Sequence, residues 1–317
     1  MPSDATLEAA TTSSAENGAR SARRKRRWVP SFEARMMLPS LLILAAISLA
    51  PFFYMIWMSF HNMSLLGGAG ITSSWNGGAN WSRMFTDPAV GQGWLAMLIY
   101  FVATVGLELV LGVGVALLVF ELVWGRNLAL SFILMPMFIA PVIVGLLGRY
   151  LVNSSYGLYA WALRQTGVYG GAIFSHPVPA FVSVVLMDVW EWTPLIALIT
   201  LAGLVSISPQ LLEAATVDGA RYRQRLRHVI LPSLTGVLVI ALLVRSMDAL
   251  RYFSTIWLST DGGPGNATKI IPLRLYEVAF RFFHLGYAAT IGLVMLAVSI
   301  LLANAFLRVL RAPKAQS

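Results

Sequence analysis

The chain contains no cysteine, and only 12% of its 317 residues are charged, whereas 57% are hydrophobic. The absence of cysteine excludes disulfides, a thiol nucleophile and thiolate metal ligands. The scarcity of charge, together with a mean hydropathy of +0.72, lies far outside the range of soluble domains. The composition therefore indicates a protein that is embedded in a membrane.

Catalytic motifs are missing as well. No lysine follows a glycine anywhere in the chain, which excludes a Walker-A loop of the form G-x-x-x-x-G-K-[ST]. There is no G-x-S-x-G elbow, no H-E-x-x-H pair and no Cys-His cluster. The histidines lie far apart, in predicted loops or near the ends of apolar runs: His61, His176, His228 and His284. We therefore expect no catalytic site, no metal and no cofactor bound by this chain.

Long apolar runs are what the sequence does contain. A helix needs roughly 20 apolar residues to cross the ~30 Å of hydrocarbon in a bilayer. Runs of that length predict six spans, at residues 38–60, 94–120, 129–152, 179–204, 234–258 and 285–308. The first run is longer than the apolar region of a signal peptide, and no Ala-x-Ala site follows it, so we expect an anchor. The predicted fold is an all-α membrane protein.

The basic residues fall mainly on one side of these spans. Fifteen lie in the two tails and the even-numbered connections, against five in the opposite loops. The positive-inside rule then places both termini and the loop 205–233 in the cytoplasm. We expect a basic, disordered tail over 1–37, a six-span domain over 38–308 and a short tail over 309–317. A basic tail that faces anionic lipid accounts for the net charge of +9, so no nucleic-acid partner is expected.

The segment 213–232, EAATVDGARYRQRLRHVILP, lies in this cytoplasmic loop. Ser208 followed by proline favours a helix start, and Asp218-Gly219 favours a break between two short helices. The segment resembles the EAA loop of ABC-importer permeases. The matching residues are Glu213, Ala214, Ala215, Gly219, Leu231 and Pro232, with Val229 where the family usually has isoleucine.

The resemblance extends over residues 38–308 and is closest to the carbohydrate and glycerol-phosphate branch. Trp190-Glu191-Trp192-Thr193-Pro194 resembles the fourth span of sugar-type permeases. Gly262, Gly263 and Pro264 resemble the extracytoplasmic turn that follows the fifth span. One departure concerns the solute contacts of the fifth span, because Ser254 stands where relatives often carry aspartate.

This resemblance implies a type I ABC-importer permease core with a cytoplasmic coupling helix, in a bacterial plasma membrane. Such a subunit forms half of a translocation pathway, here for a sugar, polyol, oligosaccharide or glycerol-phosphate-type solute. The implied partners are a second homologous permease, two ATPase subunits that hold MgATP and an extracytoplasmic solute-binding protein. In the family, the loop contacts the ATPase, so Glu213 is expected to reach a basic residue there and Gly219 to form the elbow.

Several charged residues lie inside the predicted spans, where contact with lipid is unfavourable. Each costs roughly 2.5–3.5 kcal/mol near the bilayer centre, so they should avoid lipid. They are Glu108 in the second span, Asp188 and Glu191 in the fourth, and Arg245, Asp248 and Arg251 in the fifth. Two interpretations stay open. Either they pair internally, Asp248 with an arginine or Glu191 with Arg251, or they contact the solute.

Aromatic side chains near these charges favour a sugar, because aromatic faces stack on sugar rings. The candidates are Trp190, Trp192, Tyr252 and Phe253. Prolines in the third and fourth spans predict interruptions of the kind that surround a cavity: Pro136, Pro141 and Pro194.

Three alternatives to a sugar permease remain. The nearest is an amino-acid or phosphate permease of the same superfamily. A multispan lipid-linked glycosyl or prenyl transferase would need paired acidic residues in a loop, and the loops offer only isolated acids such as Asp87 and Asp261. A purely structural scaffold would leave the 213–232 pattern unexplained.

Overall fold

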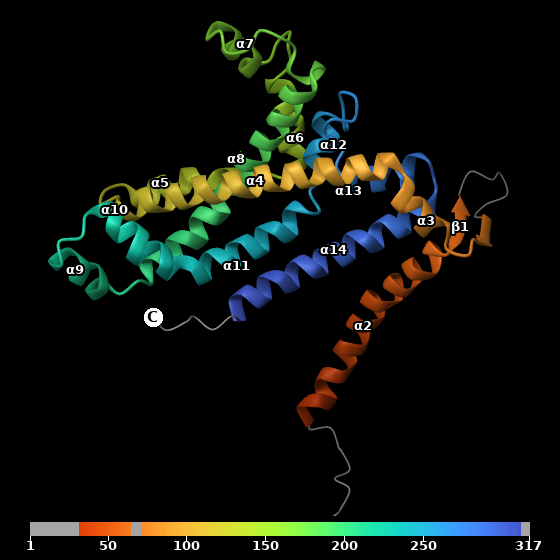
Figure 1. Ribbon diagram of the computed structural model, residues 1–317, viewed down its shortest axis with the longest axis horizontal. Helices are drawn as coiled ribbons and strands as arrows, with labels where there is room; N and C mark the ends of the chain where they lie inside the picture. Colours follow the sequence, from red (N-terminus) through yellow and green to blue (C-terminus); the bar gives the residue numbers. More distant parts are fainter. Residues whose placement is uncertain (1–31, 65–71, 312–317) are drawn as a thin grey trace, which may run out of the picture. The chain divides into compact units, whose positions relative to one another are not determined.

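The computed structural model describes residues 32–64 and 72–311, which are almost entirely helical (Figure 1). In chain order, the elements of the first half are α2 (Phe32–Ser59), β1 (His61–Ser64), β2 (Thr72–Trp75), α3 (Ala79–Thr86), α4 (Pro88–Glu121), α5 (Arg126–Leu134), η1 (Met135–Phe138), α6 (Pro141–Leu151) and α7 (Leu158–Gln165). Those of the second half are η2 (Ile173–Ser175), α8 (Pro177–Val205), α9 (Pro209–Val217), α10 (Tyr222–Arg225), η3 (Leu226–Ile230), α11 (Leu231–Ala249), α12 (Ser254–Ser259), α13 (Ile271–Tyr276), η4 (Glu277–Arg281) and α14 (Leu285–Arg311).

The chain divides into two compact units, residues 1–53 and 54–317. The described part of the first unit is the larger portion of α2, an apolar helix with Pro39 and Pro51 inside it. The helix begins at Phe32, six residues before the span predicted from the sequence. The rest of the predicted basic tail, residues 1–31, lies outside the described residues.

Five helices are long and apolar enough to cross a membrane, and a sixth span is obtained if one bent pair is counted. That pair is the third predicted span: residues 126–138 and 141–151 meet at an angle of 93°. Pro136 and Pro141 flank the break, as expected for residues that lack a backbone donor. In the fourth span, by contrast, α8 continues through Pro194. The sequence therefore predicted the number of spans and an interruption of the third span, but not its sharp angle, and the interruption predicted at Pro194 is wrong.

The predicted fifth span, 234–258, is wrong at both ends. A continuous helical stretch runs from Tyr222 to Ala249. It continues past Pro232 because the preceding segment, η3, is a π-helix, whose wider turn tolerates the missing proline N–H. At the other end the helix stops after Ala249, and a short break precedes α12. The break turns Leu250 and Tyr252 into the core and leaves Arg251 exposed.

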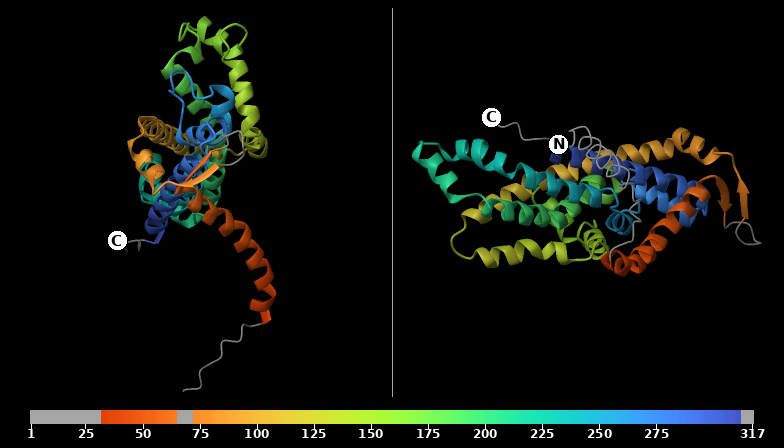
Figure 2. Two further views of the ribbon diagram at one scale, coloured as in Figure 1. Left: turned by 90° about the vertical axis from the view of Figure 1, so that its right-hand side faces the viewer. Right: turned by 90° about the horizontal axis from the view of Figure 1, so that it is seen from below.

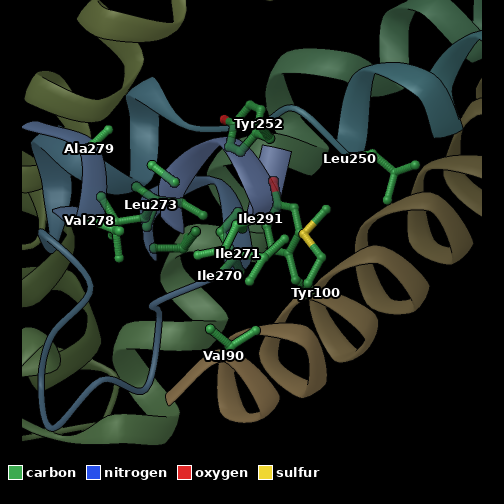
Figure 3. Close-up of a cluster of buried hydrophobic side chains, with 14 of the residues drawn as sticks. Val90, Tyr100, Leu250, Tyr252, Ile270, Ile271, Leu273, Val278, Ala279 and Ile291 are labelled. Carbon is green, nitrogen blue, oxygen red and sulfur yellow. The ribbon is translucent and has the colours of Figure 1, made fainter. Parts of the chain in front are cut away.

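The main core lies where α4, α8, α13 and α14 meet, beside the break after α11 (Figure 3). Val90 and Tyr100 enter it from α4, Ile271 from α13 and Ile291 from α14. A second cluster, which includes Leu204 and Leu234, packs α4, α8 and α11 together nearer to α9 and η3. Burial of these side chains stabilises the bundle that positions the polar residues described below.

A glycine lets α4 pack tightly against α8. A Cβ added at Gly112 would lie 2.8 Å from side-chain atoms of Ile196 and 3.1 Å from the backbone nitrogen of Ala197. Gly112→Ala should therefore lower stability by about 1–3 kcal/mol, the usual cost of overpacking a core. The matched control is Gly114→Ala, since a Cβ there meets nothing within 4 Å. Thermal unfolding in detergent compares the two variants, and equal midpoints would contradict the packing argument.

Within residues 54–317, the hairpin and the short helices α9 and α10 lie at opposite ends of the long helices (Figures 1 and 2). The hairpin pairs β1 with β2 antiparallel, with His61 opposite Trp75. It is a small departure from the predicted all-α fold. One end of the bundle thus carries the hairpin, and the other carries the loop with the 213–232 pattern.

Candidate functional site

A cluster of buried charges joins α4, α8 and α11, with Arg245 of α11 at its centre. The guanidinium donates to both oxygens of Glu108, at 2.5 and 2.9 Å. Its Nη2 also donates to Asp188 Oδ2 at 2.5 Å, and its Nη1 to Asp248 Oδ2 at 3.1 Å. The side chains of Arg245, Glu108 and Asp188 are fully buried, whereas that of Asp248 is 36% exposed. One arginine therefore holds carboxylates from three helices.

Two tyrosines extend this cluster. Tyr100 donates to Asp188 Oδ2 at 2.6 Å, and Tyr252 donates to Glu191 Oε2 at 3.1 Å. The two rings stack with their centroids 5.7 Å apart. The remaining oxygens, Asp188 Oδ1 and Glu191 Oε1, are buried and have no hydrogen-bond partner within the described part of the chain. The site therefore contains two buried acceptor oxygens without a partner, next to a network of formed hydrogen bonds.

The structure separates the predicted site residues into two groups. Glu108, Asp188, Glu191, Arg245, Asp248 and Tyr252 come together, and the Arg245 guanidinium lies 5.5 Å from the ring of Trp192. Trp190 instead lies in the wall of a different cavity and is 51% exposed. Phe253 stacks on Trp257 at 5.6 Å.

The predicted pairing of Glu191 with Arg251 is not formed. Glu191 binds Tyr252, and Arg251 donates to the carbonyl of Met247 at 3.2 Å. The reason is the early end of α11, which turns Tyr252 inward in place of Arg251. The alternative pairing of Asp248 with Arg245 is formed.

Tyr100 was missed by the sequence analysis, although a signal for it exists. Tyr100, Thr104 and Glu108 recur every four residues in an otherwise apolar run, and all three are buried. Residues at this spacing lie on one face of a helix. A polar stripe of this kind within a membrane span marks the face that packs against other charged helices.

The loop that contains the 213–232 pattern forms the short helix α9 and an elbow, after which α10 and η3 run without a break into α11. The predicted second short helix is therefore the beginning of the helix of the fifth span. α9 begins at Pro209, with Ser208 before it, as predicted; the Ser208 hydroxyl bonds the side chain of Gln210 rather than a backbone N–H. Gly219 adopts a left-handed φ of 76°. Arg225 Nη1 donates to Thr216 Oγ1 at 2.9 Å and so ties the two helices together.

The surface of this elbow combines charge with apolar side chains. Glu213, Ala214 and Asp218 are exposed, and Val217 is 87% exposed. On the opposite side, Leu212 packs against the second hydrophobic cluster. One face of the elbow therefore packs against the bundle, and the other face is exposed at the surface of the chain. Leu231 and Pro232 lie where η3 passes into α11.

The left-handed backbone at Gly219 predicts that other residues are not tolerated at this position. Any other L-residue in this conformation is strained by about 1–2 kcal/mol, even though a Cβ at Gly219 would meet nothing within 4 Å. Gly219→Ala should therefore disturb the elbow through its backbone alone. Gly236→Ala is the matched control, because it also meets nothing within 4 Å and lies inside α11. Limited proteolysis of the elbow should speed up only in Gly219→Ala; identical rates would contradict the role of the glycine.

The predicted outer turn lies between α12 and α13. Gly262 has a φ of 84°, and the bond between Gly263 and Pro264 is cis. Thr268 Oγ1 donates to the carbonyl of Gly263 at 3.0 Å. Nearby, Arg281 binds both oxygens of Asp261, at 2.7 and 2.9 Å. These bonds fix the turn against η4.

Residues 108–313 match the family described as the inner membrane component of binding-protein-dependent transport systems. The chain belongs to this family. As a binding-protein-dependent permease, it is a membrane component of a transporter and not an enzyme, and ATP hydrolysis takes place on separate subunits. Within residues 32–64 and 72–311, no three histidine, aspartate or glutamate side chains gather as metal ligands would.

Similar proteins support this assignment. The trehalose/maltose transport system permease protein MalF of Thermococcus litoralis is 33% identical over 252 residues, which cover 79% of this permease and 83% of the relative. The sulfoquinovosyl glycerol transport system permease protein SmoG of Agrobacterium fabrum is 31% identical over 280 residues, covering 87% and 89%. A chain of a bacterial ABC transporter involved in the import of alginate superposes with a TM-score of 0.77 at 20% identity, covering 88% of this permease and 95% of that chain. The last comparison establishes the fold of an ABC-importer permease.

Proposed function

We propose that this permease is one of two homologous membrane subunits of an ATP-driven importer for a sugar or a sugar-derived solute. Polyols, oligosaccharides and glycerol-phosphate-type solutes belong to the same chemical class. The observation that carries the proposal is the similarity over most of both chains to relatives named for trehalose/maltose and for sulfoquinovosyl glycerol.

The buried cluster supports a polyhydroxylated solute. Asp188 Oδ1 and Glu191 Oε1 are buried acceptors without a partner among the described residues, and the ring of Trp192, also in α8, lies 5.5 Å from the Arg245 guanidinium. Sugar hydroxyls donate to carboxylates, and the apolar face of a sugar ring packs on an aromatic side chain. Asp248, whose side chain is 36% exposed at the edge of the cluster, is the member best placed to meet a solute.

The elbow supports a coupling role at the ATPase subunits. Its exposed Glu213 and Val217 offer a charge and an apolar contact on one rigid projection. In this account MgATP binds between the partner ATPases, which close on ATP and draw the two elbows together. The permease pair then shifts between inward-open and outward-open states, since ATP binding favours one state over the other.

The residues at the two ends of the bundle indicate how the permease is oriented in the bacterial inner membrane. The elbow, with its arginines, and both termini face the cytoplasm under the positive-inside rule. The hairpin end and the Gly262–Pro264 turn face outward, where a solute-binding protein docks. A structural neighbour supports a solute-binding protein as partner, because it is an alginate transporter in complex with a periplasmic protein that holds an alginate pentasaccharide.

Uptake measurements in intact cells test the solute class. A strain that lacks the gene, and the same strain complemented with it, are given labelled disaccharides, polyols, glycerol phosphates, amino acids and phosphate. We expect the deletion to abolish high-affinity uptake of a member of the first three classes, and complementation to restore it. Loss of amino-acid or phosphate uptake instead would overturn the sugar assignment.

A substitution at Asp248 distinguishes a role in solute contact from a role in internal ion pairing. Asp248→Asn removes the charge but keeps the side-chain shape, and its only partner in the cluster is Arg245, at 3.1 Å. We expect the apparent KM for the solute to rise about tenfold or more, because hydrogen bonds to charged groups are worth roughly 1.5–3 kcal/mol. Assembly should stay normal. Glu108→Gln is the comparator, since its buried carboxylate should affect thermal stability instead; a stability loss in Asp248→Asn with unchanged KM would favour pairing alone.

A further inference from the structure

Three buried polar atoms on one turn of α8 have no hydrogen-bond partner among the described residues. They are the acceptors Asp188 Oδ1 and Glu191 Oε1 and the indole donor Trp192 Nε1. Residues at positions i, i+3 and i+4 lie on one face of a helix, so the three side chains share one side of α8. That side adjoins the charged cluster, because Asp188 binds Arg245 and the ring of Trp192 lies 5.5 Å from the same guanidinium.

Each of the two carboxylates is held through one oxygen only. Asp188 Oδ2 accepts from Tyr100 at 2.6 Å and from Arg245 at 2.5 Å. Glu191 Oε2 accepts from Tyr252 at 3.1 Å. Both tyrosines are buried and their rings stack, so they fix the orientation of the carboxylates. One oxygen of each carboxylate therefore lacks a donor, in an interior where an unpartnered acceptor is costly.

Among the described residues, the cluster has no free cation for an anionic ligand. All three nitrogens of the Arg245 guanidinium already donate to carboxylates, which belong to Glu108, Asp188 and Asp248. Glu191 forms no ion pair with a lysine or arginine of residues 32–64 and 72–311. Arg251 is exposed and donates to the carbonyl of Met247. A proton on one carboxyl group would lower the negative charge of the cluster without adding a cation.

A hydroxyl group matches this face of α8 better than a charged group does. It can donate to a carboxylate and accept from an indole N–H at the same time. An ammonium group only donates, so it would leave Trp192 Nε1 unpartnered, whereas a phosphate dianion only accepts, so it would leave both carboxylate oxygens unpartnered. Asp188 and Glu191 are about 4.5 Å apart along the helix axis, a separation that two neighbouring hydroxyls of one sugar ring can span.

Asp248 indicates where a solute reaches this face. Its side chain is 36% exposed, although its partner Arg245 also binds Glu108 near the middle of α4. A charged side chain at that depth avoids lipid, so its exposed side faces a water-filled space. Asp188 and Glu191 are buried behind it, so contact with a solute requires the helices to separate, as they do in a transporter that alternates between two states.

We propose that Asp188, Glu191 and Trp192 bind two neighbouring hydroxyls of an uncharged sugar or polyol, and that this face of α8 rejects phosphorylated, carboxylated and amino sugars. The inference rests on the proposed function, because it assigns a contact within the translocation pathway. It narrows the solute class, since the phosphate of a glycerol-phosphate-type solute would meet carboxylates whose one cation is already occupied.

Uptake of a panel matched for charge tests the solute class. The deletion strain and the complemented strain are given labelled trehalose, maltose, inositol, glycerol 3-phosphate, glucuronate, glucosamine, amino acids and inorganic phosphate. We expect the deletion to lower the uptake of one of the first three compounds at least tenfold and to leave the charged compounds unchanged. Loss of glycerol 3-phosphate, glucuronate or glucosamine uptake would overturn this inference but not the sugar importer. Loss of amino-acid or phosphate uptake would overturn the proposed function itself.

A variant of Glu191 then tests the contact with the neutral compound that the deletion strain fails to take up. The measured quantity is the apparent KM for each deoxy analogue divided by the apparent KM for the parent compound. For one pair of neighbouring hydroxyls, this ratio should be about tenfold or more in the wild type. In Glu191→Gln it should fall about threefold or more, because a hydrogen bond to a charged group is roughly twice as strong as a neutral one. The solute-binding protein is the same in both strains, so a changed ratio reports on the permease.

Two additional variants keep the test decisive if Glu191→Gln folds poorly. Trp192→Phe removes the indole N–H but keeps an aromatic ring, and it should lower the same ratio. Thr200→Val is the matched control, because it removes another buried hydroxyl of α8 that has no partner among the described residues, and it should keep the wild-type ratio. Wild-type ratios in both Glu191→Gln and Trp192→Phe would overturn the proposal, since water and not a solute hydroxyl would then meet these atoms.

Discussion

Arg245→Ala should remove most of the folded protein from the membrane. The substitution leaves Glu108 and Asp188 fully buried without their cation, in an interior that cannot hydrate them. Breaking one partner out of a buried ion pair typically costs about 3–5 kcal/mol, which is a large part of the stability of a domain. We expect the amount of monodisperse protein in detergent to fall at least tenfold, as measured by size-exclusion chromatography of a fluorescently tagged chain.

Two further variants show whether the charge of Arg245 or the geometry of its contacts stabilises the fold. Arg245→Lys keeps the charge but loses the two-pronged contact with Glu108, so an intermediate yield is expected. Arg245→Met combined with Glu108→Gln removes a charge of each sign and should recover part of the stability, since fewer buried charges are left unpaired. A single Arg245→Ala variant with wild-type yield and thermal midpoint would contradict the central position of the arginine.

Glu213→Ala should abolish coupled transport without affecting folding. The side chain is exposed on α9, and none of the hydrogen bonds or ion pairs within the described residues involves it. Its loss therefore costs this chain almost nothing. At an interface with an ATPase, by contrast, truncation of one partner of a buried charge pair costs 2–5 kcal/mol. We expect uptake to fall at least 30-fold, with normal amounts of protein in the membrane.

The matched control for Glu213 is Gln210→Ala, an exposed polar residue on the same short helix. It should leave uptake within twofold of the wild type. Binding of the purified ATPase to membranes that contain each variant separates docking from a later step: we expect it to weaken only for Glu213→Ala. Unchanged ATPase binding together with unchanged uptake would show that this carboxylate does not lie at the interface.

The sequence allowed the membrane class, the number of spans and the position of α9 and the elbow after it to be predicted, because each depends on local chemistry. Apolar runs determine spans, and Ser208-Pro209 and Asp218-Gly219 determine where short helices start and stop. Family membership is likewise confirmed, since the motifs that carried the resemblance lie in or near the matched residues 108–313.

Pairing partners could not be predicted, because they depend on how helices pack. A single α-helical register through residue 258 would have kept Arg251 on the face of Asp248, but α11 ends at Ala249. The break exchanges Arg251 for Tyr252 at Glu191. Trp190 lies apart from the charged cluster for a related reason: it is two residues from Trp192, and residues at that spacing point to different faces of a helix. The structure accordingly places Trp190 in the wall of the cavity between α6, α7 and α8, and Trp192 beside Arg245.

Co-purification shows directly whether this chain works as one permease of an ATP-driven importer. The tagged full-length chain is extracted from its native membrane in mild detergent, and the proteins retained with it are identified by mass spectrometry. We expect a Walker-A ATPase and a second permease with an EAA-type loop in amounts similar to the tagged chain. In Glu213→Ala, we expect the ATPase to be lost and the second permease to be retained. A chain that purifies alone, or with neither of these partners, would contradict it.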